Sequence, residues 1–445
     1  MPSTSTTEGL QTSADASHDD ADIAIVGAGI IGCAAALRFA QQGLRVHLLD
    51  AQPIGMGASY GNAGHIATEQ VFPPADPAIL RKLPRMLLDS TGPLRLDWRY
   101  LPQITPWLCR MLWNMRPTPF QHSVHALKTL NEHSLAAWQA LLASIDEQAL
   151  LQHHGNLTVY EKQESRDAAE TLRSRMAEQG VAVRHLSRAQ ALEQEPQLSQ
   201  RLAGALEFTD TAHVVDPYRV VKALAQAAQD HGAHFTQSRV TAAELSPDGV
   251  VLTTPQAPIK ARRVLIACGA HSAALVKEMT GQRVPLDTER GYHLMLPHAM
   301  NRLRVPVNSL ERSFIMTPME HGLRLAGTVE FAGLERPPRM DRAWHLQHHA
   351  NALFDKPLDM RDAEPWMGFR PSLPDALPVI DRMAEGRVLL AFGHQHLGLT
   401  QAALTADLVT RLLNDTEAGN NRKHDNSTPP IDLHPYRLAR FSNAK

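Results

Sequence analysis

The N-terminal part of the chain contains a strand, a glycine-rich turn, a helix and a second strand in immediate succession. The β-branched run at 22–26 (DIAIV) predicts the first strand, and the pattern G-x-G-x-x-G follows it directly. An Ala-rich stretch predicts a helix over 30–42, closed by Gly43, and the apolar run at 45–50 predicts the second strand. Two strands joined by a helix form a βαβ unit, in which both strands lie parallel in one sheet. This order predicts an α/β fold.

Each glycine of the pattern has its own steric role beside a bound dinucleotide. Gly27 permits the tight turn, Gly29 lets a pyrophosphate approach the backbone, and Gly32 lets the helix pack closely on the strand. The helix N-terminus adds unpaired N–H groups and a positive dipole end. Asp50 ends the second strand, where a carboxylate accepts hydrogen bonds from ribose hydroxyls and disfavours the 2′-phosphate of NADP. Together these residues predict a dinucleotide site, whereas the glycines alone would also suit an ordinary turn.

A second glycine-rich stretch argues for FAD over NAD. Residues 55–65 (GMGASYGNAGH) are too polar and flexible to form a core. Such a loop can lie along an extended cofactor and donate N–H groups beyond the first phosphate site. An NAD-dependent dehydrogenase remains a lesser alternative.

Length and charge limit the organisation and the partners of the chain. At roughly 100–200 residues per domain, 445 residues predict two or three domains. A formal charge of −2 provides no field for nucleic acid, and three separated cysteines predict neither a disulfide framework nor a zinc site. Residues 1–21 are rich in Ser, Thr and Asp, so we expect a disordered tail without a targeting signal. No apolar run is long enough to span a bilayer, and a cytoplasmic protein is expected.

The alternation of predicted elements indicates one nucleotide-binding domain interrupted by another. The chain is rich in predicted helices between 86 and 213, and 284–332 predicts successive strands. We therefore expect a Rossmann-like FAD-binding domain with an interleaved α+β substrate domain. The FAD-binding domain would comprise 22–85, 214–283 and 363–432, the substrate domain 86–213 and 284–362, and a C-terminal tail 433–445, with an exposed polar loop at 415–430.

Motifs spread over the chain resemble those of the D-amino-acid oxidase superfamily of flavoproteins, in particular its bacterial D-amino acid dehydrogenase-like branch. The resemblance covers nearly everything after residue 21. It rests on VGAGIIG at 26–32, SxxNAG at 59–64, VDP at 215–217, ACGA at 267–270, RGY at 290–292, WMGFRPSxPDxxP at 366–378 and GHxxxGLT at 393–400. It implies a D-amino-acid oxidase-like fold. It also implies noncovalent FAD, because 366–369 contains no Cys and Gly61 stands where histidine-linked relatives carry their His.

The same resemblance implies which residues contact FAD. Backbone contacts to adenine would come from Val240, and the segment 393–400 would close over the flavin ring. A helix N-terminus near Leu399 and Thr400 is suited to stabilise negative charge on the flavin ring during its reduction. The expected cofactor-binding residues are Gly27, Gly29, Ile31, Gly32, Asp50, Ser59, Asn62, Ala63, Gly64, Val240, Gly269, Gly393, Gly398, Leu399 and Thr400.

Three side chains are the expected catalytic residues. Arg370, in the G-x-R-P motif, would hold a substrate carboxylate through two parallel charge-assisted hydrogen bonds, which also sets the handedness of the substrate; a surface ion pair is the alternative. Tyr292 would offer its hydroxyl to the carboxylate or amine, or else be a buried structural residue. His394 would lie at the flavin with a pKa near working pH.

Three further residues lie close to these candidates in the sequence. His293 alternates to the opposite strand face and is expected to be a packing residue. His396 is a candidate for the substrate pocket. Glu330 either pairs with a substrate ammonium or is a solvated carboxylate at a strand end.

The expected reaction is FAD-dependent oxidative deamination or dehydrogenation of a D-amino or cyclic imino acid, with hydride transfer from Cα to flavin N5. An amine that binds neutral needs no general base, and no metal-ligand set is expected. The general look of the chain is similar to D-proline and hydroxy-D-proline dehydrogenases. The alternative function is a flavin-binding electron-transfer subunit of a larger amine dehydrogenase complex.

The electron acceptor stays open among quinone, oxygen and a partner protein. Residues 98–116 contain three Trp among Leu, Met and Arg. An amphipathic segment of this kind either rests peripherally on the inner membrane or packs its aromatic face on the substrate domain, and the second interpretation is favoured.

Overall fold

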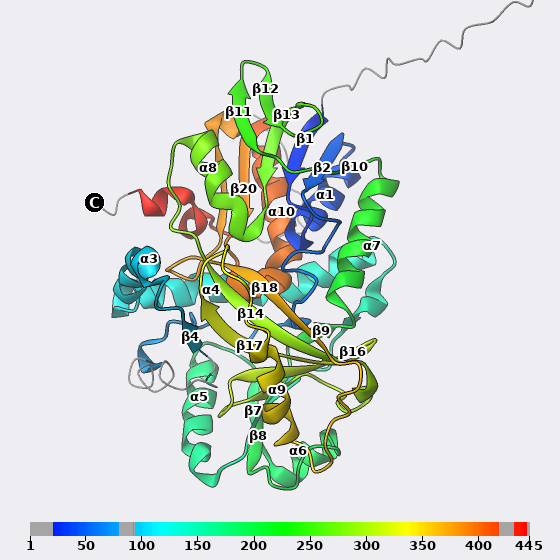
Figure 1. The fold of residues 1–445 in the computed structure, drawn as a ribbon, viewed down its shortest axis with the longest axis vertical. Coiled ribbons are helices and arrows are strands. Elements are labelled where there is room, and N and C mark those ends of the chain that lie inside the picture. Colours follow the sequence, from blue (N-terminus) through cyan, green and yellow to red (C-terminus); the bar gives the residue numbers. More distant parts are fainter. Residues whose placement is uncertain (1–20, 80–91, 93, 418–430, 443–445) are drawn as a thin grey trace, which may run out of the picture.

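The computed structural model describes residues 21–79, 92, 94–417 and 431–442. These residues form two large sheets, one above the other in Figure 1, and helices pack around both. The expected N-terminal tail lies outside the described residues, apart from Ala21, which already belongs to the first strand. Most of the expected polar loop at 415–430 also lies outside them, and its first residues continue the last long helix to Glu417.

The first sheet is built around the predicted βαβ unit. Its strands run in the order β10-β2-β1-β13-β12-β11, and β20 pairs with β13 and β19. The strands β10, β2, β1, β13 and β20 pair in parallel, as expected for apolar strands covered on both faces. The bounds are β1 Ala21–Val26, β2 Val46–Asp50, β10 His234–Gln237, β11 Ala242–Ser246, β12 Gly249–Thr253, β13 Ile259–Ile266, β19 Val379–Met383 and β20 Val388–Phe392.

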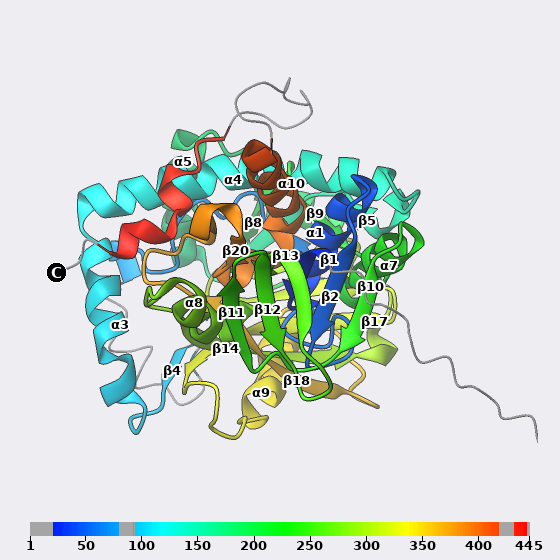
Figure 2. The same ribbon diagram turned by 90° about the horizontal axis from the view of Figure 1, so that it is seen from above.

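The helices α1, α7 and α10 pack together beside the first sheet, and α4 packs along α10 (Figure 2). We expected α4 in the substrate domain, but its Trp138 belongs to the same apolar core as α1 and α10. The indole N–H of Trp138 donates to the carbonyl oxygens of Leu399 and Thr400, at 2.9 and 3.1 Å. The structure thus differs from the predicted boundary, because the apolar face of α4 is buried by the first half. The bounds are α1 Ile30–Gln41, α4 Pro117–Ala143, α7 Pro217–Asp230, α8 Ser272–Thr280 and α10 Gly398–Glu417.

The second sheet has the order β18-β14-β17-β16-β15-β6-β8-β7, and β4 pairs with β17. The strand β18 pairs antiparallel with β14. Residues 364–372 therefore lie in the second sheet and not, as expected, in the FAD-binding domain. The bounds are β4 Leu94–Leu96, β6 Asn156–Tyr160, β7 Val183–Ser187, β8 Gly204–Phe208, β14 Asp287–Leu296, β15 Val307–Ser309, β16 Phe314–Met319, β17 Gly322–Phe331 and β18 Glu364–Ser372.

The segment expected to be rich in helices contains strands as well. The strands β6, β7 and β8 have five residues each, too short for a strong alternating pattern to stand out in the sequence. The helices of this half are α3 Leu101–Asn114, α5 Arg166–Glu178, α6 Arg188–Gln194 and α9 Asp341–Asn351. Figures 1 and 2 both place α3 on the side of the molecule opposite α7. Among the described residues, no helix combines the length and the apolar character needed to cross a membrane.

A small third sheet joins the two halves. It consists of β3 His65–Ile66, β9 Ala212–Val214 and β5 Leu151–Gln152, so the loop after β2 is tied to the second half. The described C-terminal residues are also docked, unlike a free tail. The Tyr436 hydroxyl donates to the Ala126 carbonyl at 2.7 Å, and the Leu438 N–H donates to Asp381 Oδ2 at 2.8 Å.

Candidate functional site

A cavity of about 750 Å³ extends from the carboxyl end of the first sheet to β14 and β18 of the second. Cofactor and ligand sites usually have volumes of roughly 300–1,000 Å³. All expected site residues line this cavity except Gly32, Gly64 and Thr400. The predicted dinucleotide end and the predicted substrate end therefore share one continuous space.

The turn between β1 and α1 has a backbone that requires glycine. Gly27 has φ of +113°, and its N–H donates to the Leu49 carbonyl at 2.7 Å. A Cβ atom on Gly32 would overlap the carbonyl group of Gly27. Gly32 thus permits close packing of α1 on the turn without lining the cavity. The result is a helix N-terminus whose backbone faces the cavity, an arrangement that suits a phosphate group.

Asp50 and Ser59 support this turn as well as lining the cavity. Asp50 Oδ2 accepts from the Ala28 N–H at 2.8 Å, and its Oδ1 accepts from the Gln52 N–H at 2.9 Å. Ser59 Oγ accepts from the Ile30 N–H at 2.9 Å. A carboxylate offers about four acceptor positions, so Asp50 can still accept from a ribose hydroxyl.

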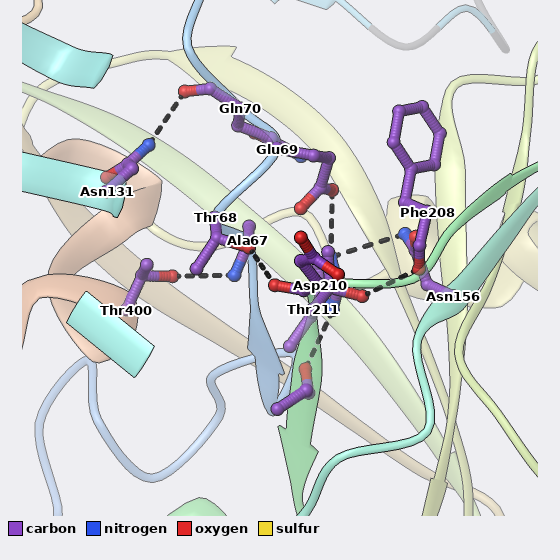
Figure 3. A network of polar contacts seen from close by, with 12 residues as sticks. Ala67, Thr68, Glu69, Gln70, Asn131, Asn156, Phe208, Asp210, Thr211 and Thr400 are labelled. Carbon is purple, nitrogen blue, oxygen red and sulfur yellow. Dashed lines mark hydrogen bonds and ion pairs between the residues drawn. The ribbon is translucent and has the colours of Figure 1, made fainter. Parts of the chain in front are cut away.

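Gly64 and Thr400 hold neighbouring segments in place. The Gly64 N–H donates to Asn62 Oδ1 at 2.9 Å, and the Gly64 carbonyl accepts from the Val214 N–H at 2.8 Å. Thr400 Oγ1 accepts from the Ala67 N–H at 2.9 Å (Figure 3). Both residues therefore position the loop after β2 and do not face the cavity themselves.

Arg370 brings a positive charge into the cavity. Its guanidinium lies against Gly291, where a Cβ atom would meet Arg370 Nε at 2.8 Å. Within the described part of the chain, its one hydrogen bond is a long contact of 3.4 Å from Nη1 to the Thr328 carbonyl. Burial lowers the pKa of Arg370, and the carboxylate of Glu289, its partner across the β14–β18 pair, opposes that shift. Most donors of Arg370 thus remain available to a carboxylate ligand.

The hydroxyl of Tyr292 is directed away from this role. It donates to Glu330 Oε2 at 2.5 Å and accepts from the Arg339 N–H at 3.2 Å. Glu330 is itself buried, and its Oε2 lies 3.7 Å from Arg290 Nη1, so it is neither solvated nor part of the cavity wall. The physical reason is a register shift between Gly291 and Tyr292, which turns the hydroxyl toward β17. Tyr292 contributes its ring to the cavity, and burial together with Glu330 raises its pKa to about 12.

His394 and His396 both line the cavity. A pKa near working pH was expected at this position, but neither ring titrates near neutral pH. His394 Nε2 contacts Thr405 Oγ1 at 3.0 Å, and burial lowers its pKa to about 3. His396 Nε2 contacts Gln70 Oε1 at 2.6 Å. Burial and the charge of Arg370 lower the pKa of His396 to about 4. Both rings are therefore neutral at neutral pH.

His293 is a packing residue. Its packing partner Trp366 lines the cavity but was not predicted as a site residue. Its Nδ1 lies 3.0 Å from the Gly61 carbonyl oxygen, and its ring stacks on Trp366 with centroids 5.0 Å apart. Trp366 lines the cavity and covers Gly61, where a Cβ atom would overlap the indole ring. The Trp in WMGFRP was the available signal for this contact.

Two more polar residues of the site were not singled out from the sequence. Glu289 stands opposite Arg370 only through strand register, and Gln70 reaches His396 from the loop after β3. Charge alternation in DTERGY hinted at Glu289, whereas no local pattern marks Gln70.

Comparison with known proteins identifies the family to which the chain belongs. Residues 22–412 match the family model described as "DAO: FAD dependent oxidoreductase". A D-amino-acid oxidase from Bradyrhizobium diazoefficiens is 33% identical over 429 residues, which cover 94% of this chain and 98% of that protein. A D-amino acid dehydrogenase from Vibrio cholerae is 27% identical over 412 residues, covering 90% of this chain and 97% of that protein.

Solved structures show the same fold. Glycine oxidase from Geobacillus kaustophilus superposes with a TM-score of 0.70 at 24% identity, covering 95% of this chain and 99% of that one. L-proline dehydrogenase from P. horikoshii superposes with a TM-score of 0.67 at 16% identity and the same coverages, 95% and 99%.

Proposed function

The chain belongs to the DAO family of FAD-dependent oxidoreductases, and on that premise we propose that it dehydrogenates a D-amino or cyclic imino acid whose carboxylate binds Arg370. FAD is the cofactor, as throughout that family. The observation that carries the proposal is the buried guanidinium of Arg370, which reaches the cavity with most of its donors free. The D configuration is supported by the two relatives named above, one an oxidase and one a dehydrogenase of D-amino acids.

Several features of the cavity support the binding of FAD there. The turn at Gly27 and Gly29 exposes backbone to a pyrophosphate, and Asp50 has acceptor capacity for a ribose. Val240, Gly393 and Leu399 line the same cavity as Arg370. When bound, FAD supplies the acceptor for the hydride that leaves the substrate Cα.

The chain itself would orient the substrate through Arg370. Two parallel hydrogen bonds from Arg370 would fix the carboxylate and leave one arrangement for hydrogen, amine and side chain. The neutral rings of His394 and His396 add no positive charge that would oppose binding of an amine. No protein base is required if the amine binds without its extra proton, so the site needs orientation more than proton transfer.

Anaerobic spectroscopy of the purified protein tests this proposal. The flavin band is recorded before and after addition of D-proline, hydroxy-D-proline, D-alanine, D-arginine, sarcosine and the L-enantiomers. We expect bleaching by at least one D-compound and none by its L-form. A yellow protein that no amine bleaches would favour an electron-transfer subunit, and a protein that binds neither FAD nor FMN would leave the NAD-dependent alternative. D-proline and hydroxy-D-proline are the first compounds to try.

The mode of flavin attachment has a simple test. We infer noncovalent FAD, because Trp366 occupies the space beside Gly61 that a linking side chain would need. Acid precipitation should release all flavin into the supernatant. Flavin that stays with the precipitate would contradict this inference.

Within residues 98–116, Trp107 is buried and packs against Phe331, as favoured from the sequence. We also infer that the exposed side chains of this segment contact a membrane peripherally, where quinone would be the electron acceptor. Trp98 and Trp113 are each 62% exposed, and Leu112 is 48% exposed. The guanidinium carbon of Arg116 lies 3.1 Å from the Trp113 ring centroid, so an aromatic and a cationic group share one exposed position. Such a surface suits anionic lipid.

Vesicle binding and reoxidation test the two parts of this inference. The wild type should cosediment with anionic vesicles, and a W98S/W113S double variant should not. Wild type that stays in the supernatant would contradict the contact. Readmission of air to the bleached protein then shows whether oxygen reoxidises the flavin.

A further inference from the structure

The ring of His396 reaches the flavin cavity, the space of about 750 Å³ described above, from a short helical turn at Gln395–Leu397. This turn packs against β18, the strand that carries Arg370. Gln395 has φ of +50°, a left-handed conformation that is unfavourable for a residue other than glycine. Its Nε2 donates to the Leu373 carbonyl at 3.0 Å, which helps to hold this backbone. The turn thus brings an imidazole ring into the cavity that Arg370 also lines.

Gln70 determines which nitrogen of His396 carries the proton. His396 Nε2 lies 2.6 Å from Gln70 Oε1. An amide oxygen accepts hydrogen bonds and does not donate them, so Nε2 is the donor of this pair. Burial and the charge of Arg370 lower the pKa of His396 to about 4, so the ring is neutral at neutral pH. A neutral ring that is protonated at Nε2 has a lone pair at Nδ1.

The contact between Gln70 and His396 is anchored in two helices. Asn131 of α4 donates through its Nδ2 to the Gln70 carbonyl at 2.9 Å (Figure 3). The Oδ1 of Asn131 accepts from Gln401 Nε2 of α10 at 2.9 Å, and both of these residues are fully buried. His396 directly precedes α10, which begins at Gly398. The fold therefore fixes the backbone of Gln70 relative to His396.

The Nδ1 atom of His396 is open to the flavin cavity. It has no hydrogen-bond partner in the described part of the chain, and it is not among the unpartnered atoms that are buried. His396 lines the flavin cavity, so this is the space in which a ligand can reach Nδ1. Arg370 supplies donors and His396 an acceptor. The two side chains together match a ligand that combines a carboxylate with an N–H group.

We propose that His396 Nδ1 accepts a hydrogen bond from the substrate amine, and that Gln70 is the positioning residue that keeps this nitrogen unprotonated. This inference rests on the proposed function and adds the amine contact to it. Because the amine N–H donates to Nδ1, the nitrogen lone pair of the amine stays free. When the Cα–H bond breaks, its electron pair leaves with the hydrogen for flavin N5, and the lone pair forms the C=N bond of the iminium product.

Two planar carboxylates that cannot be dehydrogenated in this way test the amine contact on the holoenzyme. Pyrrole-2-carboxylate carries a ring N–H beside its carboxylate, and furan-2-carboxylate has an oxygen in that place. Wild type should bind the pyrrole about 10-fold more tightly, as expected for one hydrogen bond between neutral groups. Calorimetric titration measures both affinities without turnover. Arg370→Ala should weaken the binding of both compounds, which would locate them at the proposed carboxylate site.

His396→Phe removes the acceptor and keeps a ring of similar shape. This variant should bind both compounds with equal affinity. His231→Phe is the control, because His231 is exposed at the end of α7 and does not line the cavity. A 10-fold preference for the pyrrole that persists in His396→Phe would assign the N–H contact to another residue and overturn the inference.

Gln70→Glu separates the protonation of the ring from its packing. A carboxylate in place of the amide favours protons on both ring nitrogens, so it should raise the pKa of His396. The preference of this variant for the pyrrole should be present at pH 8 and lost at pH 6, because a protonated Nδ1 cannot accept. Wild type should show the same preference at both pH values, since the pKa of its His396 is about 4.

The other charges around His396 are the same in wild type and Gln70→Glu. The turn at 395–397 packs against β18, which contributes Arg370, and against α10, whose residues from 398 to 406 are uncharged. Glu289 stands opposite Arg370, and Glu69 precedes Gln70 in the chain. Gln41→Glu is the control substitution, because Gln41 contacts Arg38 and Ser144 outside the cavity. A pH dependence found in Gln70→Glu alone therefore belongs to its contact with His396.

The remaining outcomes separate this inference from the proposed function. Equal affinity of wild type for the two compounds would overturn the amine contact and leave the carboxylate site intact. A preference in Gln70→Glu that does not change between pH 8 and pH 6 would overturn the role of Gln70. Failure of the proposed function would look different: neither compound would bind, and no amine would bleach the flavin. That result would overturn the inference as well.

Discussion

The two ends of the flavin cavity are formed by different kinds of chemical group. The nucleotide end is backbone and glycine, with Gly27 at φ of +113° and Gly32 packed against its carbonyl. The substrate end contains buried charged side chains. Arg370 on β18 stands opposite Glu289 on the neighbouring strand β14. The first end depends on conformations that only glycine adopts, and the second on charges that balance each other in a low-dielectric environment. Mutations should therefore break the two ends in different ways.

Gly32→Ala should give the largest effect, at the nucleotide end. The added Cβ would overlap the Gly27 carbonyl, so α1 must move away from the turn that we propose holds the pyrophosphate. We expect FAD affinity to fall by about 1,000-fold or more, equivalent to roughly 4 kcal/mol. Flavin absorbance of the purified protein and FAD titration of the apoprotein measure this loss.

Gly43→Ala is the matched control at the other end of α1. Gly43 has φ of +80°, but no atom lies within 4 Å of its added Cβ. Strain at this position costs about 1–2 kcal/mol of stability and should leave FAD affinity unchanged. If both variants lose flavin equally, general instability explains the flavin loss of Gly32→Ala, and the turn between β1 and α1 does not.

Arg370→Ala should give the next largest effect, with the flavin retained. Loss of the carboxylate contact should lower kcat/KM by about 1,000-fold, or roughly 4 kcal/mol of transition-state stabilisation. Arg361→Ala is the control, because this exposed side chain pairs with Asp359 on the surface. An Arg370→Ala protein with normal kcat/KM would remove the carboxylate anchor from the site.

The nucleotide end could be predicted from the sequence almost completely. The strands β1 and β2 and the helix α1 begin and end within one residue of the expected positions. Here the spacing of glycines and apolar residues is local, and each residue acts through its own backbone. Domain boundaries were less accurate, because α4 and β18 are placed by partners far away in the chain.

The substrate end could be predicted only through its motif. Arg370 lies in the cavity as expected, but the direction of the Tyr292 hydroxyl depends on a register shift between β14 and β17 that no local pattern shows. The low pKa of His396 likewise results from burial and from Arg370, which lies on β18. Side-chain electrostatics of this kind require the tertiary structure.

The Glu289→Gln variant tests directly whether the charges of Glu289 and Arg370 balance each other at the substrate end. Burial raises the pKa of Glu289, and the guanidinium of Arg370 opposes that rise. If the carboxylate balances Arg370, its loss should destabilise the substrate-free protein by about 3 kcal/mol. Urea unfolding at pH 8 measures this change.

A carboxylate ligand should rescue part of that loss. Propionate can occupy the place of a substrate carboxylate beside Arg370, so it should stabilise Glu289→Gln more than wild type. Unchanged stability of Glu289→Gln at pH 8 would show instead that Glu289 is protonated and does not balance the charge.

The smallest expected effect is a pH dependence at the flavin end of the cavity. The folded protein holds the pKa of His394 at about 3, whereas an unfolded chain takes up its proton near pH 6.5. The stability that His394 contributes is therefore full above pH 6.5 and falls as the pH is lowered toward 3. At pH 5 the loss should be about 2 kcal/mol, which His394→Asn should remove. Urea unfolding at pH 7 and pH 5 measures the difference, with the exposed His321→Asn as control. A pH dependence unchanged by His394→Asn would mean that water reaches this side chain and that the substrate end is less tightly closed than the nucleotide end.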